Sequence, residues 1–121
     1  MTRLMKPANW DKAGSLVGEG EHRVRVGLAR HYADDNAVGI QFVVEDEDDE
    51  FNGYSMFNMF RLETVPGTRL FSDFLTAVGV EMGQDGVELD SCVDKTLCVT
   101  VKHRERDGVT YDNVIAFRTA M

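Results

Sequence analysis

The feature that most constrains this chain is a series of short segments in which apolar and polar residues strictly alternate. The first segment follows Glu21, and the second follows the turn-forming sequence Asp34-Asp35-Asn36. Their apolar positions are Val24, Val26 and Leu28, then Val38, Ile40, Phe42 and Val44. In an extended chain, residues two positions apart share one face. The two segments therefore predict a hairpin of half-buried strands whose first strand points Arg23, Arg25 and Gly27 away from the core.

A third strand and a single helix follow this hairpin. Asn52-Gly53 ends the next loop, and residues 54–62 then alternate, with Met56, Phe60 and Leu62 on the core face. Pro66-Gly67 breaks this period, and the apolar residues after it recur at helical spacing: Leu70, Phe71, Phe74, Leu75 and Val78. We expect Thr68 to cap the N-terminus of this helix and Gly79 to end it.

The last two strands can be aligned with each other from the sequence. Apolar residues alternate over 97–101, and a turn follows at Asp107-Gly108. A two-residue loop there would leave Ile115 and Phe117 on the wrong face, whereas a three-residue loop with a left-handed Gly108 places them toward the core. We therefore predict the three-residue loop, which pairs Val99 with Ile115, Leu97 with Phe117, Lys102 with Asp112 and His103 with Tyr111.

The resulting order is strand, strand, strand, helix, strand, strand. This order matches the oligonucleotide/oligosaccharide-binding (OB) barrel, whose helix lies between the third and fourth strands. We predict a mainly β fold, a five-stranded OB-type barrel over residues 21–118, although other five-stranded barrels and α+β sheets also fit the order. Residues 1–20 show no sustained period and are predicted to form a mobile or loosely docked arm, with Trp10 packing on the barrel in preference to stacking on a base.

Size and composition indicate a single soluble domain. The chain has 121 residues, 43% of them hydrophobic, which is enough to bury one core. It contains no apolar run of the roughly 20 residues that a membrane span needs, and its N-terminus does not resemble a signal peptide. We therefore expect a cytoplasmic protein (in the host cell, given the resemblance described below) without membrane contact, in which Cys92 and Cys98 are reduced thiols.

The net charge of −8 argues at first against a nucleic-acid ligand. Six acids, however, form one unbroken run over residues 45–50, and the rest of the chain carries a net charge of only −2. The distribution of charge therefore matters more than the total, because an acidic loop and a basic surface can coexist on one domain.

The sequence contains no motif for catalysis or for a metal site. An EF-hand frame that starts at Asp46 would place Phe51 where glycine is needed and Phe57 where glutamate is needed. His22, His31 and His103 lack zinc-ligand spacing to one another or to the cysteines, and no nucleophile or phosphate-loop motif is present. We therefore predict a protein that is not an enzyme and holds neither a metal nor a cofactor.

A binding surface is the remaining candidate site. Aromatic side chains interleaved with bases on strands are typical of single-strand binding, because bases stack on rings while cations contact phosphates. Outward arginines also serve solubility, and the N-terminal arm could cover Phe57 instead. The residues that we predict to bind nucleic acid are Arg23, Arg25, Phe57, Arg61, Lys102 and Arg104.

Several short motifs resemble a family of small phage and prophage proteins that are regarded as OB-like single-stranded-DNA-binding proteins. They are Val17-Gly18-Glu19-Gly20, Asn52-Gly53-Tyr54 with an aromatic at Phe57, Leu75-Thr76-Ala77-Val78-Gly79, and a basic hairpin with Gly108, Tyr111 and Asn113. The chain departs from that family in its acidic run and in lacking an acidic C-terminal tail. The resemblance implies the same barrel and a role in phage DNA replication or recombination.

Two functions follow as expectations. The first is a non-enzymatic single-stranded-DNA-binding protein of phage type, with phage or host replication and recombination proteins as further partners. The second is a phage accessory protein-interaction module or host-defence antagonist that uses the acidic loop at 45–50 to meet a basic partner. An unpaired strand edge would allow a homodimer in either case.

Overall fold

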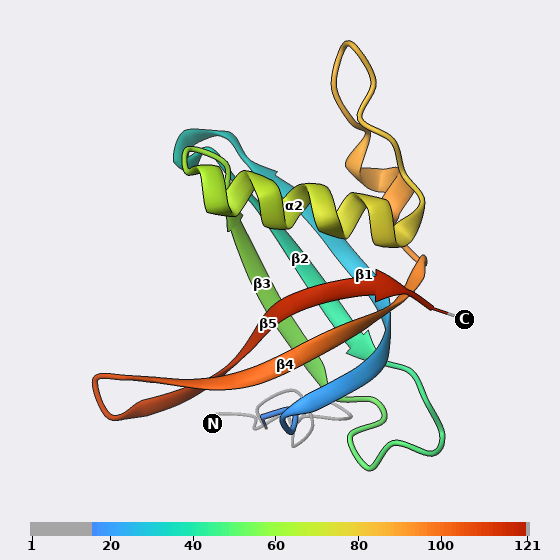
Figure 1. Cartoon of the computed structure of the whole chain (residues 1–121), viewed down its shortest axis with the longest axis vertical. Coiled ribbons are helices and arrows are strands. Elements are labelled where there is room, and N and C mark those ends of the chain that lie inside the picture. Colours follow the sequence, from blue (N-terminus) through green and yellow to red (C-terminus); the bar gives the residue numbers. More distant parts are fainter. Residues whose placement is uncertain (1–15, 121) are drawn as a thin grey trace, which may run out of the picture.

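The strands and the helix occur in the predicted order. The computed structural model describes residues 16–120, so the expectations for the first 15 residues, including the packing of Trp10, lie outside it. The described chain is mainly β, with five antiparallel strands and one α-helix between the third and fourth strands (Figure 1). The elements are β1 (Gly20–Tyr32), η1 (Ala33–Asp35), β2 (Ala37–Val44), β3 (Ser55–Arg61), α2 (Val65–Val78), η2 (Leu89–Cys92), β4 (Thr96–Arg106) and β5 (Val109–Thr119).

The sheet is organised around the long strand β1. Its first half pairs with β4 and its second half pairs with β2, so the strand order is β3-β2-β1-β4-β5. Within residues 16–120, no ladder of hydrogen bonds joins the edge strands β3 and β5, so the sheet is not closed. The β4–β5 pair crosses over the other three strands, and α2 packs against both edge strands (Figure 1).

Aromatic rings fill the space between the sheet and α2. Phe74 of α2 lies 5.8 Å from Phe42 of β2 and 5.7 Å from Phe60 of β3, measured between ring centroids. Phe117 of β5 contacts all three rings at 5.7–5.8 Å. The prediction that Phe74 and its neighbours form the apolar face of the helix is thus confirmed. Because this cluster draws on β2, β3, β5 and α2, it holds both sheet edges against the helix.

The helix begins earlier than the sequence analysis predicted. Thr64 is the N-cap, and its side-chain oxygen accepts a hydrogen bond of 3.0 Å from the amide of Gly67. Pro66 stands in the first turn, where its missing amide hydrogen costs no helical hydrogen bond. The prediction of Thr68 as the cap was therefore wrong, because Pro66-Gly67 belongs to the helix and does not precede it. Gly79 ends the helix as predicted, in the left-handed region with φ of 75°.

A β-bulge at Gly27 reverses the direction of side chains along β1. Val26 pairs with Phe42, but Leu28 pairs with Gln41, so β1 carries one extra residue between these pairs. The prediction that Leu28 faces the core was wrong, since its side chain is 46% exposed. Alternation resumes beyond the bulge in the opposite phase. The residues that consequently face away from the core are Leu28, Arg30 and Tyr32.

A second bulge determines the register of the last hairpin. Asp107 and Gly108 form a two-residue loop, and both have positive φ, 53° and 78°, as a type I′ turn requires. The register then shifts by one residue beyond the Val101–Val114 pair, which sets Val99 opposite Phe117. The predicted three-residue loop was wrong, because the bulge and not the turn brings Phe117 to the core. The predicted partners of Lys102 and His103 were also wrong, since these residues are opposite Asn113 and Asp112.

Residues 16–19 lie ahead of β1 and are named the strap. Val17 of the strap is fully buried in the core, and its amide donates a hydrogen bond of 3.0 Å to Asp112 of β5. Cys92 and Cys98 are buried and unbridged, as expected. In the described range, no helix is both long and apolar enough to cross a lipid bilayer.

Candidate nucleic-acid interface

The surface of β1, β2 and β3 that faces away from the core carries the predicted aromatic residue, Phe57, and two of the predicted arginines, Arg25 and Arg61. Directly opposed residues of antiparallel neighbours point to the same face. The register therefore places four rows of side chains across this surface, which is named the outer face. The rows are Arg25–Val43–Ser55, Leu28–Gln41–Phe57, Arg30–Gly39–Met59 and Tyr32–Ala37–Arg61.

Phe57 and Tyr32 meet over Gly39. A Cβ atom at position 39 would lie 2.4 Å from Cζ of Phe57 and 2.9 Å from Cε2 of Tyr32. Carbon atoms in contact are ordinarily about 3.5–4.0 Å apart, so both rings occupy the room that the missing side chain leaves. Phe57 is 49% exposed, as the sequence predicted. These two rings over Gly39, named the ring platform, offer an aromatic surface on the outer face.

Two arginines flank the ring platform. The guanidinium carbon of Arg30 lies 5.5 Å from the centroid of the Tyr32 ring, which is within cation–π distance. Arg61 belongs to the same row as Tyr32 and is separated from it by the small side chain of Ala37. Both arginines are exposed, and neither forms an ion pair with a carboxylate among residues 16–120. The outer face thus combines two aromatic rings with solvent-facing positive charge.

The two arginines at the start of β1 have different surroundings. Arg25 donates from Nε to Glu45 at 2.8 Å and from Nη1 to Asp94 at 3.2 Å. A phosphate could reach this guanidinium only by displacing both carboxylates, which weighs against Arg25 as a nucleic-acid ligand. Arg23 is exposed and stands opposite Cys98 of β4. It lies nine residues from Tyr32 along β1, a span of at most about 30 Å at the usual rise per residue.

Lys102 and Arg104 lie together on the hairpin of β4 and β5, which extends beyond the rest of the sheet (Figure 1). They alternate along one face of β4 with Arg106, and Tyr111, which is 51% exposed, stands opposite Arg104. The predicted residues are therefore divided between three places. Phe57 and Arg61 lie on β3, Lys102 and Arg104 share the hairpin, and Arg23 and Arg25 lie near the start of β1.

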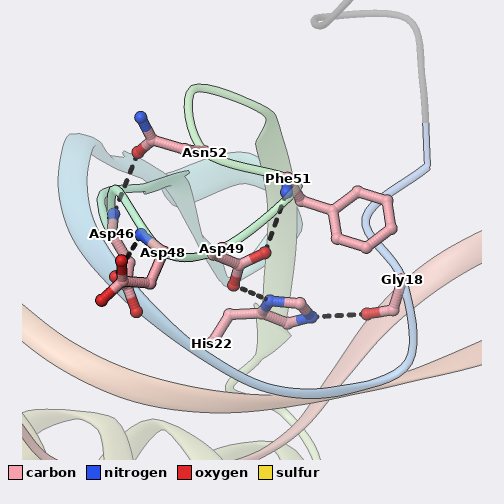
Figure 2. Close-up of polar contacts among 7 residues, drawn as sticks. All are labelled: Gly18, His22, Asp46, Asp48, Asp49, Phe51 and Asn52. Carbon is pink, nitrogen blue, oxygen red and sulfur yellow. Dashed lines mark hydrogen bonds and ion pairs between the residues drawn. The ribbon is translucent and has the colours of Figure 1, made fainter.

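The acidic run forms a structured loop between β2 and β3. The side chains of Asp46 and Asp49 accept hydrogen bonds from the amides of Asp48 and Phe51, at 3.0 and 2.8 Å, and the Asn52 side chain accepts one from the amide of Asp46 at 2.9 Å (Figure 2). Glu45 is paired with Arg25. Three of the six acids, Glu45, Asp46 and Asp49, are thus occupied by contacts within the fold. The residues of the run that stay exposed without such a role are Glu47, Asp48 and Glu50.

The sequence analysis missed Arg30, Tyr32 and Gly39. Simple alternation from Val24 assigns Arg30 and Tyr32 to the core face, and the bulge at Gly27 moves them outward. A signal that could have indicated the site is the pair of small residues Ala37 and Gly39 on the solvent side of β2, because such positions leave room for neighbouring rings.

The described residues contain no group of three or more side chains placed to hold a metal ion. Every fully buried side-chain nitrogen or oxygen in the described range has a hydrogen-bond partner. The outer face and the hairpin therefore stay the candidate site. Comparison with known proteins finds no matching protein-family model and no match among curated proteins.

Proposed function

We propose that this protein is a non-enzymatic single-stranded-DNA-binding protein with an OB-type fold. The order β3-β2-β1-β4-β5, with a helix between β3 and β4, is the order expected for an OB barrel opened between β3 and β5. OB folds bind oligonucleotides on the face formed by their second and third strands and on the loop between the fourth and fifth. The ring platform and the basic hairpin occupy these positions.

The ring platform is the observation that carries this proposal. An exposed phenylalanine beside a tyrosine, with arginines on both sides, can stack unpaired bases while the cations contact phosphates. Stacking of one base on a ring is worth about 1–3 kcal/mol and tolerates any base, because every base has a π-face. Paired bases within a duplex do not expose these faces, so the site favours single strands.

The ligand-binding residues in this proposal are Arg30, Tyr32, Phe57 and Arg61 on the outer face, with Arg23, Lys102 and Arg104 extending the contact to phosphates. Arg25 is not one of these residues, because its guanidinium is paired with Glu45 and Asp94. The role in phage DNA replication or recombination, within the host cytoplasm and alongside proteins of those processes, follows from the family resemblance. The unpaired edges of β3 and β5 are where a second copy would add to the sheet.

Fluorescence titration of labelled oligonucleotides tests the proposal. Single strands of about 20–30 nucleotides exceed one OB site, so the protein should bind them at low salt and bind a duplex of the same length more weakly. Contact of three to five cations with phosphates predicts a slope of about −2 to −3.5 for log affinity against log salt concentration. Absence of binding to single strands at low salt would contradict the proposal.

Paired variants locate the binding site. Phe57→Ala with Arg61→Ala removes one ring and one cation from the outer face and should weaken binding by at least about tenfold, from the loss of one stacked base and one phosphate contact. Val65→Ala with Arg69→Ala is the matched control, because both side chains are exposed on α2. Replacing Glu47, Asp48 and Glu50 by glutamine should not weaken DNA binding, whereas the function in protein interaction requires these acids.

A further inference from the structure

His22 lies buried between two hydrogen-bond acceptors that belong to different parts of the chain. Its Nδ1 is 2.5 Å from the Oδ2 atom of Asp49 in the acidic loop, and its Nε2 is 2.6 Å from the carbonyl oxygen of Gly18 in the strap (Figure 2). The ring is 6% exposed, and Phe51 covers it edge-on at 5.7 Å between centroids. His22 thus joins the strap to the acidic loop.

A neutral imidazole cannot satisfy both contacts, because it carries one N–H group while both neighbours accept. A second proton must therefore lie between Nδ1 and Asp49, and it belongs to the ring because a carboxylic acid is ordinarily the stronger acid. We propose that His22 is a buried imidazolium that clamps the strap to the acidic loop, and that loss of its proton loosens the strap. This inference does not depend on DNA binding.

Asp49 is the charged group that faces this ring within the described residues. Glu19 of the strap points elsewhere, to the amide of His103, and β4 presents Val99 opposite His22. Along β1 itself, Glu21 pairs with Arg118 and Arg23 is exposed on the other face. The two ring nitrogens of His22 therefore contact one carboxylate and one carbonyl oxygen, and both of these groups are hydrogen-bond acceptors.

His103 provides an internal contrast. Its Nε2 is 2.8 Å from the carbonyl oxygen of Val17, and this contact with one acceptor is satisfied by the neutral ring. The strap is thus attached to the basic hairpin independently of pH and to the acidic loop only while His22 is charged. The His22 contact therefore stabilises the strap while the ring is protonated, and this stabilisation is lost when a rise in pH removes the second proton.

Nitrogen-15 NMR of the histidine rings tests the protonation state in the intact protein. At about pH 7.5, where an ordinary histidine is mostly neutral, both ring nitrogens of His22 should carry hydrogen. A single N–H on His22 at the same pH would overturn the proposal, because the ring would then be neutral and could not donate to both acceptors.

Hydrogen exchange of the Val17 amide tests the clamp. When His22 loses its proton as pH rises, the strap keeps only its contacts at Val17 and therefore opens more often. The protection factor of the Val17 amide should then fall about 10- to 100-fold, the loss expected for one charge-assisted hydrogen bond. Asp49→Asn should abolish this fall, because the amide can donate to Nδ1 of a neutral His22 while its oxygen still accepts from Phe51. Asp48→Asn is the matched control, because it makes the same charge change at an exposed position of the same loop.

The hydrogen-exchange results either support or overturn the proposed clamp. A pH-dependent loss of protection in the unmodified protein and in Asp48→Asn, but not in Asp49→Asn, supports the clamp. Constant protection across the transition overturns it, and so does an equal fall in Asp49→Asn, because that variant keeps both ring contacts without the charge.

Discussion

Replacement of Gly39 by alanine should separate DNA binding from folding. The added Cβ would lie 2.4 Å from Phe57 and 2.9 Å from Tyr32, whereas carbons in contact need about 3.5–4.0 Å. The Phe57 ring must therefore move by about 1.1–1.6 Å and the Tyr32 ring by about 0.6–1.1 Å. Because Phe57 is 49% exposed, its ring can rotate into solvent without disturbing the core.

The expected magnitudes differ for the two properties. Displacing the rings removes the stacking of one base, worth about 1–3 kcal/mol, so binding should weaken by about 5- to 150-fold. Folding stability should change by less than about 1 kcal/mol, because alanine is favoured over glycine within a strand by about 0.5–1 kcal/mol, which offsets the lost ring contact. Oligonucleotide titration and urea denaturation measure the two effects.

Gly27→Ala is the control for this variant. The atoms nearest to the added Cβ would be the flexible end of Gln41, at 2.8 Å from its Oε1 atom, and Cγ2 of Val43 at 3.3 Å, and none of them belongs to either ring. Its DNA binding should therefore equal that of the unmodified protein. The reasoning is refuted if Gly39→Ala binds single strands as tightly as Gly27→Ala does, while the NMR signals of Phe57 and Tyr32 show that the rings have moved.

Two further predictions concern stability and charge. Thr64→Ala removes the N-cap of α2 and should lower the free energy of unfolding by about 1 kcal/mol in urea denaturation, whereas a helix capped by Thr68 would be unaffected. The hydrogen bond from Arg118 lowers the pKa of Glu21 below the usual range of glutamate, so its stabilising contribution is present at neutral pH and is lost as pH falls through that lowered pKa. Arg118→Ala should return the pKa of Glu21, followed by carbon-13 NMR, to its ordinary value.

Residue patterns within single segments predicted much of the fold. The alternation of Val38, Ile40, Phe42 and Val44 places these side chains in the core, and the helical spacing around Phe74 identifies the buried face of α2. Gly79 ends the helix because its left-handed conformation strongly favours glycine. The exposure of Phe57 follows from the same alternation, because its neighbours Met56 and Phe60 are apolar residues that fill the core.

The two bulges show where this reasoning stops. A bulge costs little locally, and its position depends on which side chains the partner strands and α2 bring to the core. Gly27 therefore turns Arg30 and Tyr32 outward, and the shift beyond Val101 carries Phe117 into the ring cluster. The candidate site was predicted in part for this reason. Phe57 and Arg61 lie on β3, whose pairing with β2 contains no bulge, so simple alternation gives their correct face. Arg30 and Tyr32 come after the bulge in β1, so simple alternation gives the wrong face.

The sequence by itself determined which of the described segments are strands, where α2 lies and which of their residues are apolar enough to need burial, because these properties depend on residues a few positions apart. The tertiary structure alone decided the hairpin register, the meeting of Tyr32 with Phe57 over Gly39, and the burial of His22 between Gly18 and Asp49. Each of these joins segments whose relative position is selected by the packing of the whole core, which no local pattern contains.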